Sequence, residues 1–173
     1  MIERSYKVSL VGDPSVGKTS IALRQAQGAF PEEHSPTLGS NILIWNTVYK
    51  DIKIKLVIAD TGSQEKFKYV LPSYFKNSLA AAVIFDITNR RTYENTKKWI
   101  TLLKQSIGPI PFIIVGNKID LEDMRQVSLE DGEYLAQQYN TEYIEVSAKM
   151  SENLNNMFNK LVELAYSQDK SLK

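Results

Sequence analysis

Apolar residues along the chain follow two kinds of spacing, which alternate from one end to the other. Nearly continuous apolar runs at 79–87 and 111–115 are typical of parallel strands covered on both faces. Shorter β-rich runs at 6–11 and 142–146 predict two further strands. Runs at 42–49 and 52–59 are close enough in sequence to form an antiparallel hairpin across Lys50 and Asp51.

Between these runs, apolar residues recur every three or four positions, which predicts amphipathic helices. One helix is expected from Gly17 to about Gln27, a second over 93–107, and a closing helix over 154–165. Ser128, with Asp131 three residues later, resembles a capping box that opens another helix. Pro31 and Pro36 break regular structure in the loop between the first helix and the hairpin.

This alternation predicts an α/β fold with a doubly wound sheet. We expect a single domain over residues 1–173, with six strands, one of them an antiparallel edge strand, and five helices. Ligands of such sheets bind at the carboxyl ends of the strands. The candidate chemistry should therefore lie in the loops that follow the strands.

Composition narrows the functional classes. The chain has 173 residues, of which 43% are hydrophobic and 24% charged, and its net charge is +1, so no basic surface points to nucleic acid. It contains no cysteine and one histidine, which makes disulfides, thiolate chemistry and His-rich metal sites improbable. No apolar run is long enough for a signal peptide or a membrane span. We therefore expect a soluble protein of the cytoplasm.

A phosphate-binding motif follows the first predicted strand. Residues 12–19, Gly-Asp-Pro-Ser-Val-Gly-Lys-Thr, satisfy the P-loop pattern in its strand-to-helix setting. Such glycines let the backbone amides converge on phosphate oxygens, and the helix N-terminus adds a positive dipole end. Lys18 would reach the β- and γ-phosphates, while the Thr19 hydroxyl would ligate Mg²⁺. The motif alone suits an ATPase or a nucleotide kinase equally well.

The motifs after the later strands resemble those of small GTPases of the Ras superfamily. Residues 117–120, Asn-Lys-Ile-Asp, look like the family's NKxD motif, and 147–149, Ser-Ala-Lys, look like its SAK motif. A carboxylate such as Asp120 can accept two hydrogen bonds from the donor edge of guanine, which adenine lacks. The resemblance further implies that Asn117 holds the base and braces the loops, that the Lys118 stem lies over the base, and that the Ala148 amide donates to it.

The same resemblance assigns two switch segments. Residues 60–65 look like the family's DTAGQE segment, so that Asp60 would hold Mg²⁺ through water and Gln64 would orient the attacking water. Thr37 resembles the switch I threonine that closes over Mg²⁺ and the γ-phosphate in the GTP state. Phe30 matches an aromatic that packs against guanine, although a core phenylalanine is an equally good interpretation.

Taken together, the sequence predicts binding of GTP or GDP with Mg²⁺. The predicted catalytic residues are Gln64, Lys18 and Thr37, and the predicted metal ligands are Thr19, Thr37 and Asp60. The predicted nucleotide contacts are Asp13, Pro14, Ser15, Val16, Gly17, Lys18, Thr19, Ser20, Phe30, Ser63, Asn117, Lys118, Asp120, Ser147, Ala148 and Lys149.

Segments such as 73–76 and 85–88 resemble Rab-like members in particular, which implies a role in vesicle trafficking or signalling. The expected partners are an exchange factor, a GTPase-activating protein and effectors that contact the two switches. We expect a monomer that does not bind nucleic acid. A Rab protein would continue past Tyr166 into a lipidated tail, so membrane attachment is expected only through a tail beyond these residues.

Two positions depart from the family pattern. Pro14 lacks an amide donor, has a fixed φ, and would point its ring toward the γ-phosphate. Ser63 stands where the family has the glycine that senses the γ-phosphate, and so it could slow the switch. The leading hypothesis is a slowly hydrolysing GTPase switch. The alternatives are a pseudo-GTPase that binds nucleotide with negligible turnover, and a P-loop kinase, which residues 117–120 disfavour.

Overall fold

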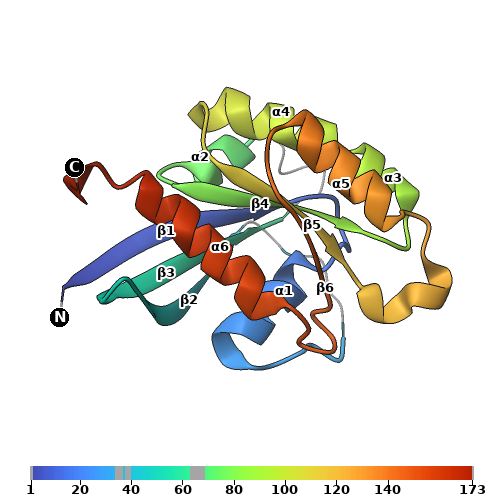
Figure 1. Cartoon of the computed structure of the whole chain (residues 1–173), viewed down its shortest axis with the longest axis horizontal. Helices are drawn as coiled ribbons and strands as arrows, with labels where there is room; N and C mark the ends of the chain where they lie inside the picture. Colours follow the sequence, from blue (N-terminus) through green and yellow to red (C-terminus); the bar gives the residue numbers. More distant parts are fainter. Residues whose placement is uncertain (1, 34–36, 38–39, 63–68, 173) are drawn as a thin grey trace.

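One six-stranded sheet forms the centre of the molecule (Figure 1). The computed structural model describes residues 2–33, 37, 40–62 and 69–172. Its sheet has the strand order β2-β3-β1-β4-β5-β6, and every neighbouring pair is parallel except β2 with β3. The strands are β1 (Glu3–Val11), β2 (Ser40–Tyr49), β3 (Ile52–Thr61), β4 (Ala80–Asp86), β5 (Phe112–Asn117) and β6 (Tyr143–Val146). The predicted mostly parallel sheet with one antiparallel edge strand is confirmed.

The helices connect these strands. In the described part of the chain they are α1 (Lys18–Gln27), α2 (Leu71–Phe75), α3 (Arg90–Glu94), α4 (Thr96–Ile107), α5 (Leu129–Gln138) and α6 (Leu154–Ser167), with two short 3-10 helices, η2 (Ile119–Met124) and η3 (Lys170–Leu172). Ser128 and Asp131 form the predicted capping box at the start of α5. None of the helices in this part of the chain is long and apolar enough to cross a membrane.

The described residues contain six α-helices where five were predicted. The helix expected over 93–107 begins at Arg90 and is divided at Asn95 into α3 and α4, and the sequence patterns did not locate α2. Asn89 opens α3 by accepting a hydrogen bond from the Arg91 amide. At the division, the Thr96 hydroxyl donates to the Tyr93 carbonyl, 2.6 Å away, and so occupies a main-chain acceptor of the preceding turn. Spacing of apolar residues cannot detect such a break, since the same face stays buried on both sides of it.

The hairpin between β2 and β3 forms where the sequence predicted it. Tyr49 pairs with Ile52, and both intervening residues have positive φ, 48° at Lys50 and 60° at Asp51. Two left-handed residues in succession are the signature of a type I′ turn, whose twist matches that of the flanking strands. The antiparallel pairing then continues to the far end of both strands, where Ser40 lies opposite Thr61.

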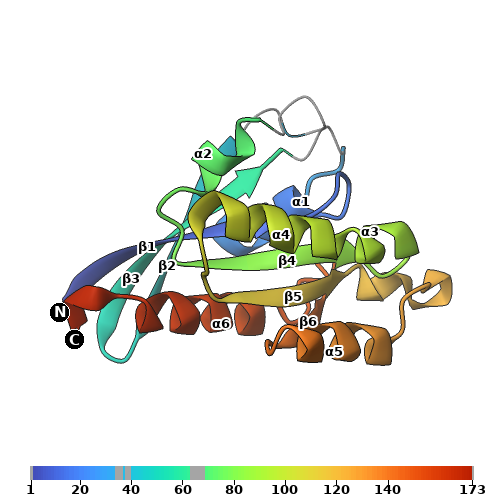
Figure 2. The same cartoon turned by 90° about the horizontal axis from the view of Figure 1, so that it is seen from above.

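Two apolar clusters cover the two faces of the sheet. On one face α1 and α6 pack over β1, β3 and β4, with Phe158 and Leu161 fully buried. On the other face α4 and α5 pack over β4 and β5, and α2 packs against β3 and α4, around Phe75 and Phe85. Figure 2 shows α4 and α6 on opposite sides of β4 and β5. Burial on both faces explains why the central strands are apolar along their whole length.

Candidate nucleotide-binding site

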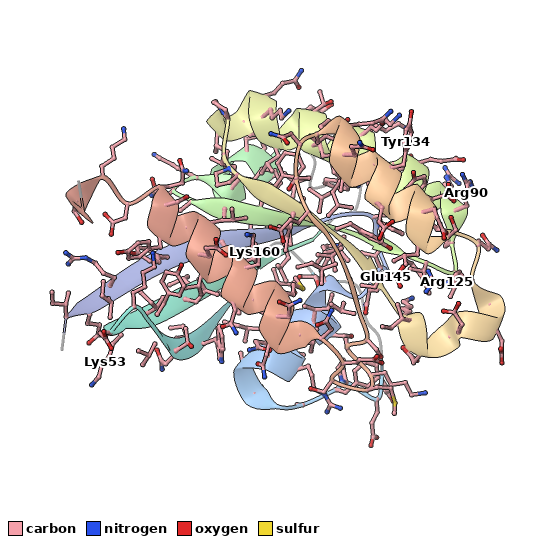
Figure 3. All side chains as sticks on the ribbon, in the orientation of Figure 1. Lys53, Arg90, Arg125, Tyr134, Glu145 and Lys160 are labelled. Carbon is pink, nitrogen blue, oxygen red and sulfur yellow. The ribbon has the colours of Figure 1, made fainter. Side chains whose placement is uncertain are left out.

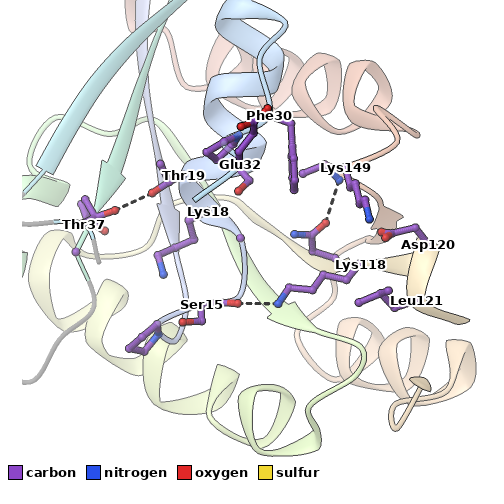
Figure 4. A pocket seen from close by; sticks show the side chains of 18 residues that line it. Ser15, Lys18, Thr19, Phe30, Glu32, Thr37, Lys118, Asp120, Leu121 and Lys149 are labelled. Carbon is purple, nitrogen blue, oxygen red and sulfur yellow. Dashed lines mark hydrogen bonds between the residues drawn. The ribbon is translucent and has the colours of Figure 1, made fainter. Parts of the chain in front are cut away.

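A cavity of about 920 Å³ opens at the carboxyl ends of the strands (Figure 4). It is bordered by the loop after β1, the loop after α1, the end of β3, the loop after β5 and the loop after β6. Its lining residues are Pro14, Ser15, Gly17, Lys18, Thr19, Ser20, Phe30, Pro31, Glu32, Thr37, Thr61, Gly62, Asn117, Lys118, Asp120, Leu121, Ala148 and Lys149. The size suits a nucleotide, and most of the residues predicted to contact one are brought together here.

The loop after β1 has the backbone that a phosphate cradle requires. Gly17 opens α1 in a left-handed conformation with φ of 100°. A Cβ atom at this position would lie 2.2 Å from Asn117 Nδ2, so the close approach of the two loops itself demands glycine. Glycine at this position therefore lets the loop after β1 and the loop after β5 approach each other closely.

Lys18 is held beneath this loop. Its ammonium donates to the carbonyl oxygens of Gly12 at 2.9 Å and Asp13 at 2.7 Å. Burial lowers the pKa of Lys18 to about 8, while the charges of Asp60 and Asp13 oppose that shift. A polyphosphate in the cavity would add negative charge beside the ammonium and so favour its protonated form.

Three described residues of the predicted contact set, Asp13, Val16 and Ser147, do not line the cavity. Val16 is fully buried, and its carbonyl accepts a hydrogen bond from Asn117 Nδ2 at 2.9 Å. The Asp13 carboxylate is bound by Asn95 and Trp99 instead of facing the cavity. At Asp13 and Val16, only the main chain is left to meet a ligand. Ser147 is fully buried, and its hydroxyl binds Asp120 instead of facing the cavity.

Ser15 has a conformation that sequence reasoning did not anticipate. Its φ is 65°, in the left-handed region that favours glycine. Ser15 also lines the cavity, and its carbonyl accepts a hydrogen bond from Lys118 Nζ at 2.9 Å. The left-handed backbone at Ser15 therefore carries a conformational cost. A serine within a regular helix carries no such cost.

We expect Ser15→Gly to raise the free energy of unfolding of the nucleotide-free protein by roughly 1 kcal/mol, because glycine adopts this φ without steric cost. Urea denaturation measures the change. Ser106→Gly, in the last turns of α4, is the matched control and should lower the same quantity by a similar amount. Equal destabilisation by both substitutions would contradict a strained Ser15.

Three oxygen-bearing side chains meet at the phosphate end of the cavity. The Thr19 hydroxyl donates to Asp60 Oδ2 at 2.6 Å and lies 2.7 Å from the Thr37 hydroxyl. Since Thr19 gives its single proton to Asp60, Thr37 is the donor between the two threonines. Figure 4 shows Thr37 reaching across to Thr19.

The chemistry of these donors fits Mg²⁺. Asp60 is fully buried, and its Oδ1 has no hydrogen-bond partner among the described residues. Burial raises the pKa of this carboxyl, against the effects of the Thr19 hydrogen bond and the Lys18 charge. A buried carboxylate beside two hydroxyls is costly unless a cation offsets it, and hard oxygen donors are what Mg²⁺ prefers.

The other end of the cavity is built from the loops after β5 and β6. Asp120 Oδ1 accepts a hydrogen bond from the Ser147 hydroxyl at 2.7 Å, and that hydroxyl in turn accepts from the Met150 amide at 3.0 Å. Asn117 joins two loops, because its Nδ2 donates to Val16 while its Oδ1 accepts from the Ala148 amide at 3.2 Å. The Ala148 amide, which was predicted to donate to the base, thus donates to the Asn117 side chain in this structure.

Lys118 is fixed at both sides of its head group. Its ammonium is 2.7 Å from Asp86 Oδ2 and donates to the Ser15 carbonyl. Asp86 also accepts two hydrogen bonds from Thr88, through its amide and its hydroxyl. The extended lysine stem therefore runs along the cavity wall, as Figure 4 shows, beside Asp120 and opposite Phe30.

An ion pair missed by sequence reasoning supports this end of the site. Arg125, directly after η2, binds Glu145 of β6 through two hydrogen bonds of 2.7 and 2.9 Å and also contacts Glu122. Figure 3 shows Arg125 and Glu145 next to each other at the end of the sheet. The Tyr143 hydroxyl donates to the same carboxylate, and burial raises the pKa of that tyrosine. The pair ties the segment after Asp120 to the strand that leads to Ser147.

Ser63 and Gln64, predicted to sense the γ-phosphate and to orient water, lie outside the described residues. The neighbouring Thr61 and Gly62 line the cavity, so β3 delivers the chain to the phosphate end of the site. Phe30 lines the cavity and also packs against the first apolar cluster, so both of its proposed roles have support.

A comparison with protein-family models places the whole arrangement in a known family. The model of the Ras family matches residues 7–167, which includes every strand-end loop described above. The motifs identified from the sequence occur in that span in family order, and the fold confirms the predicted GTPase-type sheet. The chain therefore belongs to the Ras family of GTP-binding GTPases, which switch between GTP- and GDP-bound forms.

Proposed function

We propose that this protein is a Mg²⁺-dependent guanine-nucleotide switch that hydrolyses GTP slowly. One observation carries the proposal: Asp120, oriented by Ser147, faces the same cavity as Lys18 and Thr19. A carboxylate that can accept hydrogen bonds from guanine and a loop that can bind phosphates thus occupy opposite ends of one site.

At the base end, the Ser147 hydrogen bond occupies part of Asp120 Oδ1 and fixes the carboxylate in the cavity wall. The remaining lone pairs suit the two adjacent donors of guanine. The stem of Lys118 and the ring of Phe30 offer apolar surfaces for the two faces of a planar base. Adenine would place no such pair of donors against the carboxylate.

At the phosphate end, the amides at the start of α1 and the ammonium of Lys18 attract the polyphosphate. Thr19 and Thr37 would ligate Mg²⁺ directly, and Asp60 would hold it through water, so that crowded phosphate charge is neutralised. Thr37 comes from the loop before β2, so a nucleotide that recruits it changes the surface offered by that loop. Exchange factors, activating proteins and effectors are the partners that would read such a change.

Turnover is proposed to be slow, at or below roughly 10⁻⁴ s⁻¹ for the isolated protein, as in unassisted Ras-type sites. Gln64→Leu should remove most of this activity, because the water then loses its orienting amide. Ser63→Gly should raise the rate if backbone freedom beside Gln64 limits it. Single-turnover hydrolysis at saturating Mg²⁺ and equal nucleotide loading measures both. An unchanged rate in Ser63→Gly would refute the role of Ser63 as an impediment and leave the switch itself intact.

A second candidate is a pseudo-GTPase that retains nucleotide without turning it over. Pro14 favours it, because this residue lines the cavity, lacks an amide proton and precedes the strained Ser15. The same single-turnover measurement separates the two candidates. A wild-type rate equal to that of free GTP, unaffected by Gln64→Leu, would establish the pseudo-GTPase.

The direct test of the proposed ligand is chromatography of the nucleotide released from the purified, heat-denatured protein. We expect GDP, with a smaller fraction of GTP. Adenine nucleotide, or no nucleotide after reconstitution with GDP and Mg²⁺, would overturn the proposal.

We further propose a cytoplasmic monomer of the Rab-like type that acts in vesicle trafficking or signalling, in line with its resemblance to those members.

A further inference from the structure

The Asp13 carboxylate is bound from outside the nucleotide site. Its Oδ1 accepts a hydrogen bond from the indole Nε1 of Trp99 at 2.7 Å, and its Oδ2 accepts one from Asn95 Nδ2, also at 2.7 Å. Trp99 lies in the first turn of α4, and Asn95 is the residue between α3 and α4. Both carboxylate oxygens of Asp13 thus accept hydrogen bonds from residues at the start of α4, which lie more than eighty positions further along the chain.

The main chain of Asp13 is held at the same time. Its carbonyl accepts a hydrogen bond from Lys18 Nζ at 2.7 Å, and it is followed by Pro14, whose ring restricts the residue before it. Any rotation of the Asp13 peptide would therefore move an acceptor of the lysine that faces the phosphates. The side-chain contacts with α4 hold this peptide in register.

These contacts also determine the position of the negative charge of Asp13. Pro14 and Ser15, next to Asp13, line the cavity, whereas Asp13 does not. A carboxylate that turned into the cavity would repel a polyphosphate. Asn95 and Trp99 are both partly buried, and their hydrogen bonds stabilise the negative charge of Asp13 against α4 instead.

We propose that Trp99 and Asn95 are positioning residues of the nucleotide site: they hold the Asp13 carboxylate against α4, and thereby keep the phosphate loop in shape and its negative side chain away from the phosphates. The proposal rests on the proposed guanine-nucleotide function. It makes nucleotide retention depend on a helix that contributes no residue to the cavity lining among the described residues.

Trp99 also packs against the apolar cluster around Phe85, so the competing explanation is that it only fills space. A double-mutant cycle separates the two explanations, because lost packing persists when Asp13 is removed and a lost hydrogen bond does not. The variants are Trp99→Phe, Asp13→Ala and their combination. Trp45→Phe is the matched control, since Trp45 is the other of the two tryptophans in the chain and packs on Phe158.

The measured quantity is the dissociation rate of a fluorescent GDP analogue in the presence of Mg²⁺ and excess unlabelled GDP. Loss of one hydrogen bond to a carboxylate corresponds to about a tenfold faster release in Trp99→Phe. In the Asp13→Ala background the same substitution should change the rate less than about twofold, and Trp45→Phe should leave the wild-type rate unchanged. Equal acceleration by Trp99→Phe in both backgrounds would overturn the proposal. If Trp99→Phe does not fold, Asn95→Ala enters the same cycle with the same expectation and the same contradicting result.

A spectroscopic measurement tests the hydrogen bond itself. In Trp45→Phe protein, Trp99 gives the single indole N–H signal in a proton–nitrogen NMR spectrum. This signal should shift on Asp13→Ala and again when GDP is removed, because the phosphate loop holds the acceptor. A signal that responds to neither change would also overturn the proposal. Failure of the wild-type protein to retain GDP would instead refute the proposed function, so the two failures are distinguishable.

Discussion

Replacing Asp120 with asparagine is expected to weaken GTP binding by about 3 kcal/mol, which is more than a hundredfold in the dissociation constant. The substitution exchanges a double acceptor for a group that presents a donor to the donors of guanine. Xanthine carries an oxygen where guanine has its amino group, so affinity for xanthosine triphosphate should rise in the same variant. Competition with a fluorescent nucleotide analogue measures both dissociation constants.

Asp123→Asn is the matched control for this experiment. Asp123 also lies in η2, three residues further on, but it is exposed and does not line the cavity. Its substitution makes the same chemical change and should leave both dissociation constants within about twofold of the wild type. Unchanged GTP affinity in Asp120→Asn would remove the basis for assigning guanine as the base.

Removal of Mg²⁺ is expected to speed GDP release by roughly 100-fold, which corresponds to about 2.7 kcal/mol. Thr19 and Asp60 meet beside Lys18, and without the ion these oxygens and the phosphates repel one another. Release of a fluorescent GDP analogue, followed with and without excess chelator, measures the effect. In Thr19→Ala the ratio of the two rates should fall well below the wild-type ratio, because one ligand is already lost.

Thr101→Ala serves as the control for the loss of a threonine hydroxyl. Thr101 is exposed on α4, where its hydroxyl donates to the Lys97 carbonyl within the helix. The variant should keep the wild-type response to chelator. Equal release rates with and without chelator in the wild-type protein would contradict a site in which a metal links Thr19 to the nucleotide.

Sequence patterns predicted most of the site because its chemistry is contained in short, contiguous motifs. Lys18 and Thr19 belong to a loop whose spacing of glycines follows directly from the shape of a phosphate cradle. Asn117 and Asp120 follow a buried strand, and parallel strands deliver such residues to one edge of the sheet. The structure indeed places these side chains around one cavity.

The supporting contacts could not be predicted in the same way, because each joins residues that are distant in sequence. Nothing near Asp13 in the chain reveals that its carboxylate meets Trp99. The pairing of Arg125 with Glu145 depends on how η2 lies against β6. The left-handed backbone of Ser15 is likewise invisible in a motif that accepts any residue at that position.

The sequence by itself determined the order of the six strands and the four longer helices, the turn at Lys50 and Asp51, and the residue types available at each strand end. These follow from local rules: the period of the apolar residues, the preference of particular residues for turns, and the amides of a helix start. Tertiary structure alone decided the outward direction of the Asp13 carboxylate and the convergence of Thr19, Thr37 and Asp60. Those outcomes depend on hydrogen bonds between elements, whose partners are chosen by the packing of the whole sheet and not by any neighbouring residue.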